Sequence, residues 1–367
     1  MLKRIFKLNP AGLIVSLLSG AVIALHLILR GNRQLMKKLS ENGVKPIRLA
    51  QIGFTSGFRF SLAELLIAAA VLGIMAYLIC SVVQIAKGEK KLQRAGRVLI
   101  TLAACGLFVY AGFCFLWGTY YYGDDFITQS GLENRKISTE QLEDVTRRFA
   151  ELAGEYSRIV QRDENGVYCA DKKAILARSP EVYKAVETQF PCLKGPSAPA
   201  KGIVCSKVMS LIDFTGFYFP FTGEANVNID CPANELPSTV AHELAHLRGV
   251  AKEQEANFAA VLASLEYGDA DYVYSAALLA YTHLGNALHS ADYSAWEKIW
   301  TELDGNVKKD FAVNNEYWAK YKTPVKTISN SVYEGFLFSY SQDMGLKSYG
   351  ACVDLLVNYY YGRPLME

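Results

Sequence analysis

The sequence predicts a mainly α-helical protein, with an N-terminal membrane region and a larger helical domain that contains a short strand. Three apolar segments, each about long enough to cross a bilayer, lie in the first third of the chain. From residue 138 onwards, hydrophobic residues recur mostly at helical spacing, whereas residues 222–229 alternate as a short strand does. We therefore expect a membrane region at residues 1–122 and a second domain at residues 123–367.

The three predicted transmembrane helices are residues 11–29, 62–86 and 98–118. The first contains one histidine, the second contains one glutamate near its start, and the third contains no charged residue. The first segment is interpreted as a retained anchor and not as a cleaved signal peptide, because two further spans follow it. The third span ends in Phe115 and Trp117, and Tyr120, Tyr121 and Tyr122 follow it, as expected of the aromatic residues found at membrane surfaces.

The distribution of basic residues predicts the orientation in the membrane. The loop between the second and third spans is rich in lysine and arginine, which favours a cytoplasmic location for this loop and for the N-terminus. The part after residue 120 is then outside the cytoplasm, and the protein is expected to be a multi-pass protein of the cell membrane. The linker at residues 30–61 is also basic, so the reverse orientation is the alternative.

Charge and cysteine content exclude two classes of site. The net charge is +2 and no basic patch follows residue 120, which argues against nucleic acid as a partner. The eight cysteines form no CxxC pair, so we expect no cysteine-based zinc site. Disulfides among the five cysteines of the second domain are allowed if that domain lies outside the cytoplasm.

Several helices are predicted in the second domain. The first follows Ser138, which resembles an N-cap and precedes apolar residues at helical spacing. Residues 204–212 fit a short helix or a strand, and residues 216–221 fit an aromatic turn. The other predicted helices are residues 180–188, 252–265, 272–288, 293–303, 314–320, 332–343 and 348–360.

The sequence HELAH at residues 242–246 is the most informative motif. In a helix, His242 and His246 lie one above the other on the same face, so both imidazoles can reach one metal ion. Glu243 lies one step round the helix, where its carboxylate can act on a water molecule without ligating the metal. Ser238 is expected to cap this helix and Gly249 to end it. This context predicts a zinc site and not a structural histidine pair.

A third ligand is needed, because a catalytic zinc usually has three protein ligands and one open position. Lys252 stands where the pattern HExxHxxGxxH has its third histidine, and an ammonium group cannot ligate zinc. Glu253 is the expected third ligand, and Glu255 is the alternative. Asn257 lies one turn after Glu253, where its side chain can orient a ligating imidazole. This set of ligands is typical of gluzincins.

The strand at residues 222–229 is expected to be an edge strand beside the helix of the motif. An edge strand there can hold an extended peptide by main-chain hydrogen bonds. An ordinary core strand is the alternative. The first interpretation assigns substrate binding to Gly223, Glu224, Ala225, Asn226, Val227 and Asn228.

Three segments resemble the bacterial membrane family catalogued as domain of unknown function 3810, which is placed among gluzincin-like peptidases. They are PFTGEANVN before HELAH, ExEANF after it, and GLKSYGACVDLL near the C-terminus. The resemblance covers most of the chain, including residues 60–66 at the start of the second span. It implies zinc on His242, His246 and a following glutamate, with Glu243 catalytic, and it supplies no substrate. ExxAN is also similar to the ExxAD element of other membrane-tethered gluzincins, with Asn257 in place of aspartate.

We therefore expect a membrane-anchored, zinc-dependent metallopeptidase, a hydrolase whose partners are a peptide or protein substrate and the lipid bilayer. Glu243 would take a proton from the water that zinc activates and later give it to the leaving amine. Tyr349, in the family-like C-terminal segment, is the expected donor to the oxyanion, and His283 is the alternative. The alternative function is a catalytically inactive zinc-containing membrane receptor or assembly factor, with His283 or Glu255 in the fourth zinc position.

Overall fold

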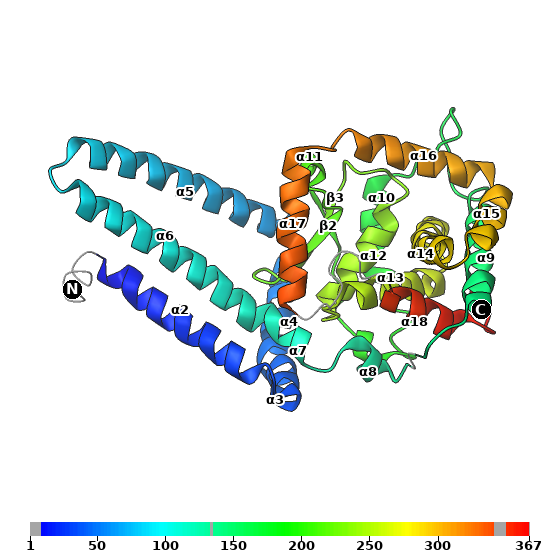
Figure 1. Ribbon diagram of the computed structural model, residues 1–367, viewed down its shortest axis with the longest axis horizontal. Helices are drawn as coiled ribbons and strands as arrows, with labels where there is room; N and C mark the ends of the chain where they lie inside the picture. The colour runs from blue at the N-terminus through cyan, green and yellow to red at the C-terminus, as the bar shows by residue number, and fades with distance from the viewer. Residues whose placement is uncertain (1–8, 133–134, 341–349, 367) are drawn as a thin grey trace. The chain divides into compact units, whose positions relative to one another are not determined.

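The computed structural model describes residues 9–132, 135–340 and 350–366 (Figure 1). Helices account for 70% of the structure and strands for 4%, which confirms the predicted, mainly helical class. The chain divides into two compact units. The first contains the described residues of Met1–Gln51, Leu62–Gly123 and Pro220–Thr222. The second contains those of Ile52–Ser61, Asp124–Phe219 and Gly223–Glu367.

Three helices of the first unit are long and apolar enough to cross a membrane. They are α2 (Pro10–Leu29), α5 (Leu62–Lys87) and the continuous helical segment Lys91–Tyr122. The last consists of α6 (Lys91–Phe113), a π-helical segment η2 (Cys114–Gly118) and α7 (Thr119–Tyr122). Asn9 caps α2 by accepting a hydrogen bond from the Gly12 N–H, and Pro10 suits the first turn. All three predicted apolar spans are therefore helical, and the third continues beyond its predicted end.

The basic segment between α2 and α5 is helical and not an extended linker. It contains α3 (Arg33–Lys38), a π-helical segment η1 (Leu39–Val44) and α4 (Lys45–Thr55). Within the first unit, the guanidinium group of Arg48 lies 5.0 Å from the centre of the Tyr120 ring. Arg48 is therefore engaged with one of the aromatic residues that follow the third apolar segment.

The second unit contains a three-stranded sheet with the order β1-β3-β2. The central strand β3 (Glu224–Asn228) pairs in parallel with β1 (Lys201–Ile203) and antiparallel with β2 (Gly216–Phe219). The strand predicted at residues 222–229 thus forms, but the expectation that it lies at an edge is wrong. The prediction of an aromatic turn at residues 216–221 is also wrong for residues 216–219, because these residues pair with β3.

Helices make up most of the rest of the second unit. They are α8 (Phe126–Ser130), α9 (Thr139–Tyr156), α10 (Lys172–Arg178), α11 (Ser206–Leu211), α12 (Leu236–Leu247), α13 (Glu253–Tyr267), α14 (Ala270–Ala291), α15 (Tyr293–Glu302), α16 (Gly305–Ala319), α17 (Pro324–Ser339) and α18 (Gly350–Tyr360), with two short 3-10 helices, η3 (Ser179–Glu181) and η4 (Pro191–Leu193). The capping box at Ser138 is present. The predicted helix ends at residues 343 and 348 lie outside the described residues.

The helix predicted at residues 180–188 does not form. The chain leaves η3 at Glu181 and continues in turns to residue 189. Val182, Tyr183 and Val186 are fully buried within this stretch. Packing of these side chains into the core overrides the local helical pattern.

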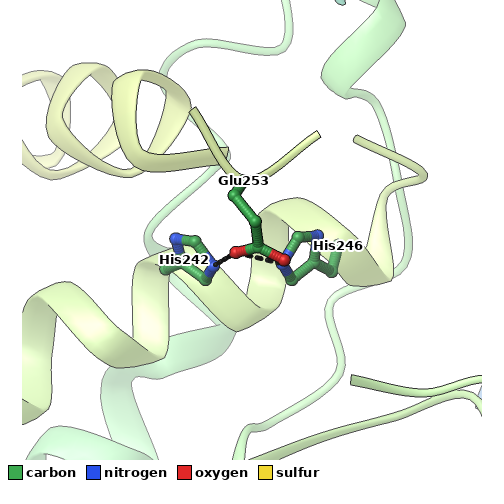
Figure 2. A group of neighbouring side chains, drawn as sticks. All are labelled: His242, His246 and Glu253. Atoms are coloured by element: carbon green, nitrogen blue, oxygen red, sulfur yellow. Dashed lines mark hydrogen bonds and ion pairs between the residues drawn. The ribbon is translucent and has the colours of Figure 1, made fainter. Parts of the chain in front are cut away.

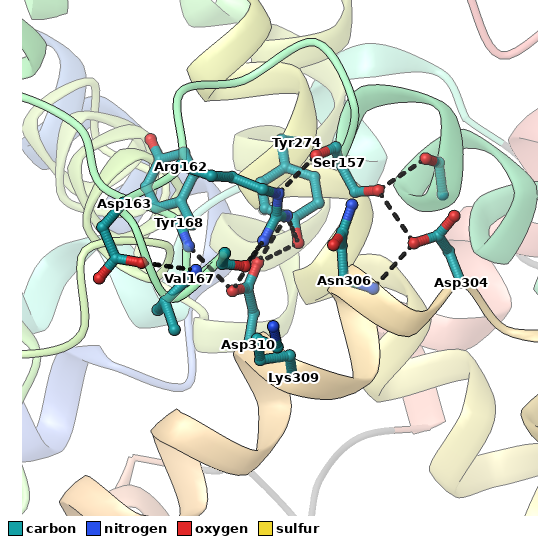
Figure 3. Close-up of polar contacts among 12 residues, drawn as sticks. Ser157, Arg162, Asp163, Val167, Tyr168, Tyr274, Asp304, Asn306, Lys309 and Asp310 are labelled. Carbon is teal, nitrogen blue, oxygen red and sulfur yellow. Dashed lines mark hydrogen bonds and ion pairs between the residues drawn. The ribbon is translucent and has the colours of Figure 1, made fainter.

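The core of the second unit surrounds α14, most of whose residues are buried. A buried polar network joins α14 to α16 and to the loop before α10 (Figure 3). At its centre, the carboxylate of Asp310 forms an ion pair with Arg162 at 2.9 Å and accepts hydrogen bonds from the Tyr274 hydroxyl and the Tyr168 N–H. The charges of Arg162 and Asp310 are buried as a pair, so neither is left isolated in the core. Their pairing fixes α16 to the loop before α10.

The cysteines form no disulfide, and all eight lie within the described residues. Cys231 and Cys352 are buried. Burial raises the pKa of both thiols, that of Cys231 to about 12, so at neutral pH they pack as small apolar side chains.

Candidate metal centre

The HELAH motif lies on α12, and the helix begins earlier than predicted. It starts at Leu236, with Pro237 in the first turn, so Ser238 lies inside the helix and is not its N-cap. Proline suits a first turn because that turn does not use its N–H groups within the helix. The Ser238 N–H instead donates to the Ser275 hydroxyl at 2.9 Å. The helix ends at Leu247, and Gly249 follows with a φ of 95°, a conformation that favours glycine.

The structure brings together His242, His246 and Glu253 (Figure 2). Oε2 of Glu253 lies 3.1 Å from Nε2 of His242 and 3.6 Å from Nε2 of His246. The histidines are one turn apart on α12, and Glu253 is the first residue of α13. One ligand atom from each residue lies within 4.8 Å of the others. In the part of the chain that the structure describes, neither Glu255 nor His283 belongs to this group.

The other ring nitrogen of each histidine faces an oxygen atom. Nδ1 of His242 lies 2.8 Å from Oδ1 of Asn257, and Nδ1 of His246 lies 2.7 Å from the backbone oxygen of Val250. A proton on Nδ1 that is donated to such an oxygen leaves the lone pair of Nε2 available. Both Nε2 atoms are those that face Glu253, so the two rings are oriented as metal ligands require.

The charges around His246 favour a cation at this point. Burial lowers the pKa of His246, but the neighbouring carboxylates of Glu253 and Glu243 outweigh burial and raise it to about 9. Burial alone would raise the pKa of Glu253, but the two histidines outweigh burial and hold this pKa well below its usual value. The group therefore stabilises positive charge on the imidazole of His246 and negative charge on the carboxylate of Glu253.

Glu243 lies beside this group and is only 4% exposed. Its Oε2 atom makes no hydrogen bond to any described residue. Burial raises its pKa to about 7, against the opposing effect of His242 and His246. A buried carboxylate oxygen without a partner, next to two imidazoles, is arranged to receive a proton from a bound molecule.

Strand β2 passes directly beside Glu243. A Cβ atom built on Gly216 would lie 2.6 Å from Oε1 and 2.7 Å from Cγ of Glu243. Only glycine allows the backbone of β2 to approach the carboxylate so closely. Because β2 is an end strand of the sheet, the edge strand beside Glu243 is β2 and not β3.

The side chains of the predicted peptide-binding strand are engaged inside the protein. Glu224 pairs with Lys201 at 2.5 Å, Asn226 accepts a hydrogen bond from Ser61 at 2.6 Å, and Asn228 donates to Ser210 at 2.8 Å. Ala225 and Val227 are buried in the core, and Gly223 has a φ of 69° before the strand begins. Since β3 is paired on both sides, the reason for assigning substrate binding to residues 223–228 is removed.

The alternative ligand Glu255 has a different set of contacts. Its Oε2 accepts a hydrogen bond from the Phe126 N–H at 2.8 Å, at the start of α8. Its Oε1 lies 3.7 Å from Nζ of Lys252, which pairs with Asp125 at 2.6 Å. Glu255 and Lys252 therefore fix the start of α8 against the start of α13.

The two expected oxyanion donors differ in what can be said of them. Tyr349 lies outside the described residues. His283 is buried on α14, and its pKa is lowered to about 4, first by burial and then by the charge of His242. The imidazole of His283 is therefore neutral at pH 7.

Sequence reasoning missed two residues of the site, Gly216 and Tyr333. The Tyr333 hydroxyl, on α17, donates to Oε1 of Glu253 at 2.8 Å, although the two residues are 80 positions apart. No sequence motif marks this tyrosine. Gly216 carried a weak signal, because it is a glycine that opens an aromatic strand, GFYF.

The fold and the site define a mainly helical protein with three helices able to span a membrane and a partly buried His-His-Glu group. The family described as protein of unknown function (DUF3810) matches residues 42–357, and the chain belongs to this family. The match includes α5, α6 and the whole His-His-Glu group. The comparisons with curated proteins and with solved structures found no match.

Proposed function

We propose that the protein is a membrane-anchored zinc peptidase of the gluzincin type. The observation that carries this proposal is the convergence of His242, His246 and Glu253 beside the buried, unpartnered Oε2 of Glu243. Two imidazoles and one carboxylate are the ligand set of several catalytic zinc sites. A metal site alone would not explain the adjacent carboxylate, and a general base alone would not explain the orientation of both rings.

The donors present fit zinc. Both Nε2 atoms face the Glu253 carboxylate, and both Nδ1 atoms face oxygen atoms that can hold them in the ligating tautomer. No fourth histidine, cysteine, aspartate or glutamate joins the group within residues 9–132, 135–340 and 350–366. This supports a site with an open position for water and substrate over a closed structural site.

Glu243 would act as the general base. When bound, zinc would supply the positive charge that polarises a water molecule and the carbonyl group of the substrate. Glu243 accepts a proton from the attacking water at Oε2 and later returns it to the nitrogen of the leaving amine. Burial, which raises the pKa of Glu243 to about 7, suits a group that both accepts and donates a proton near neutral pH.

Strand β2 is the proposed binding site for the main chain of the substrate. It is an end strand of the sheet, and its first residue, Gly216, lies against the Glu243 carboxylate. An extended peptide that paired with the outer edge of β2 would pass beside Glu243. Tyr349 stays the proposed donor to the oxyanion, with His283 as the second choice.

The proposed arrangement in the cell follows from the apolar helices and the basic loop between α5 and α6. The membrane-spanning helices lie within residues 1–122, and residues 123–367, with residues 52–61 of the same compact unit, make up the proposed peptidase domain, which we place outside the cytoplasm. Its partners are then the lipid bilayer and peptide or protein substrates.

Replacing Glu243 by glutamine tests the proposed function. We expect the full-length Glu243→Gln variant, purified in detergent, to retain zinc and to lose cleavage of a peptide library by at least about 1000-fold, because the amide cannot accept the proton. The matched control is Glu151→Gln, an exposed position on α9 that should cleave as the wild type does. Equal cleavage by wild type and Glu243→Gln would exclude the proposed mechanism.

A further inference from the structure

Helix α17 is fixed to the segment between α11 and β2 by polar contacts from one of its faces. Lys326, Asn330 and Tyr333 are spaced four and three residues apart, which places them on the same face of the helix. Nζ of Lys326 lies 2.8 Å from Oδ1 of Asp213, and Asn330 donates to Oδ2 of Asp213 at 3.1 Å. The Ser329 hydroxyl donates to the backbone oxygen of Ile212 at 2.9 Å. Two of these three contacts are therefore made by the carboxylate of Asp213.

Asp213 has an unusual backbone conformation. Its φ is 66°, and it is the only non-glycine residue with a positive φ among those that the structure describes. Aspartate adopts this region more readily than most residues, although at a cost relative to glycine. Glycine would suit the backbone at this position better but would make neither of the two contacts with α17. The side chain, and not the backbone, therefore explains an aspartate here.

The same face of α17 brings Tyr333 to the metal centre. The ring of Tyr333 packs against Phe214, the neighbour of Asp213, with the ring centres 5.2 Å apart. Its hydroxyl donates to Oε1 of Glu253 at 2.8 Å. The other oxygen of Glu253, Oε2, is the one that faces His242 and His246. Oε1 of Glu253 thus accepts a hydrogen bond from Tyr333, and Oε2 faces the two imidazoles.

We propose that Tyr333 is a positioning residue for Glu253, the third metal ligand, and that Asp213 fixes the position of Tyr333 by holding α17 in place. A carboxylate can ligate a metal through one oxygen or through both. Donation from Tyr333 to Oε1 holds Glu253 in one rotamer and presents Oε2 alone to the site. This inference rests on the proposed zinc site, but it concerns zinc affinity and not hydrolysis.

The Tyr333→Phe variant removes the hydroxyl and leaves the ring. With the full-length protein in detergent, we expect zinc to bind about 10-fold more weakly in competition with a chromophoric chelator. The visible absorption of the Co²⁺-substituted protein should also change, because Oε1 becomes free to enter the coordination of the metal. A purely structural role of Tyr333 would not alter this spectrum.

The matched control is Tyr293→Phe. Tyr293 also donates to a glutamate carboxylate, that of Glu297 at 3.3 Å, but on α15 and outside the metal centre. Its substitution should change neither the zinc affinity nor the Co²⁺ spectrum.

The Asp213→Gly variant tests the anchor, since glycine adopts a φ of 66° without strain and the variant removes both side-chain contacts of Asp213 with α17. We expect weaker zinc binding than in the wild type, and no further loss when Asp213→Gly is added to Tyr333→Phe, because both act through the same hydrogen bond. Additive losses would overturn the role of Asp213.

The outcomes separate this inference from the peptidase proposal. If the wild type binds zinc and Tyr333→Phe binds it equally well with an unchanged Co²⁺ spectrum, the role of Tyr333 is overturned and the peptidase proposal is unaffected. If Tyr333→Phe weakens zinc binding but the wild type cleaves no peptide, the inference holds and the peptidase proposal fails. A wild type that binds no zinc would overturn both.

Discussion

Glu243 and Gly216 lie against each other, and in the proposed peptidase their fit would determine whether Glu243 can act as the general base. Glu243 lies buried on α12, and its carboxylate has room because Gly216 carries no side chain. The position of a general base must be accurate to a fraction of an ångström, because a misplacement of about 1 Å can lower the rate about 100-fold. A small change at Gly216 should therefore act on catalysis before it acts on the fold.

We predict that Gly216→Ala lowers kcat/KM for peptide cleavage by about 100-fold and leaves zinc binding unchanged. The added Cβ would lie 2.7 Å from Cγ of Glu243, which is inside the side chain and not at its flexible end, so the carboxylate must move. The three atoms nearest to this Cβ all belong to Glu243 and none to the proposed ligands, which is why the metal should stay. Steady-state cleavage and metal analysis measure the two effects.

The control for this prediction is Gly305→Ala. Gly305 is the first residue of α16, and a Cβ at this position would meet nothing within 4 Å. Normal cleavage by both variants would mean that Glu243 is not the base or that β2 does not restrict it.

At the residue scale, the sequence could predict that His242, His246 and Glu243 lie together, because their relation is local and follows from helical spacing alone. It also predicted that Glu253 and Asn257 lie near the histidines, and the structure places both there. It could not identify Tyr333, whose contact with Glu253 depends on how α17 packs against a segment far away in the chain. A contact of this kind has no period or spacing that a sequence would show.

At the scale of elements, the side chain of Lys252, which cannot ligate a metal, instead stabilises the packing of two helices. Lys252 precedes α13 and pairs with Asp125, whose carboxylate also caps α8 by accepting a hydrogen bond from Thr128. The pair fixes α8 at the start of the helix that carries Glu253. Lys252, which stands where the pattern HExxHxxGxxH has its third histidine, thus has a structural role in place of a metal-binding one.

The pair between Asp125 and Lys252 should make stability depend on pH. Burial raises the pKa of Asp125, but hydrogen bonds from Lys252 and Thr128 outweigh it and lower the pKa to about 2. The folded pKa is below that of the unfolded chain, so the stabilisation is present above about pH 4 and is lost as the pH falls towards about 2. Because the side chains are 37% and 25% exposed, solvent screening limits it to about 1 kcal/mol.

We therefore predict that Asp125→Asn lowers the free energy of unfolding by about 1 kcal/mol at pH 7, and that the difference from the wild type shrinks as the pH falls below about 4. Thermal unfolding in detergent at a series of pH values measures this. Asp144→Asn, on the exposed surface of α9, is the control and should have little effect, since its pair with Arg148 is 3.9 Å long. A difference between wild type and Asp125→Asn that does not vary with pH would contradict the account.

Elements with strong periodicity were predictable from the sequence, whereas their neighbours were not. The alternation of residues 222–229 correctly predicted a strand, but not that β1 and β2 would pair with it on both sides. Helical spacing predicted most helices of the second unit, yet it failed at residues 180–188, where three fully buried side chains determine the path of the chain. Periodicity indicates the secondary structure that a segment favours, whereas packing determines which other segments it contacts.

For the whole molecule, the apolar helices were the most predictable part, because length and hydropathy are local properties. Which residues belong to each compact unit was less predictable from the sequence. Residues 52–61 belong to the unit that contains the His-His-Glu group, and there Lys201 donates to the Thr55 backbone oxygen at 2.7 Å and Ser61 donates to Asn226. The segment that precedes α5 is therefore part of the same unit as the sheet and the site.

Metal analysis of the full-length protein, purified in detergent from zinc-supplemented cells, will show whether His242, His246 and Glu253 hold zinc. We expect about one zinc per chain in the wild type and in Glu243→Gln, and almost none in His246→Ala. Equal zinc contents in the wild type and His246→Ala, or a wild type without zinc, would contradict this expectation.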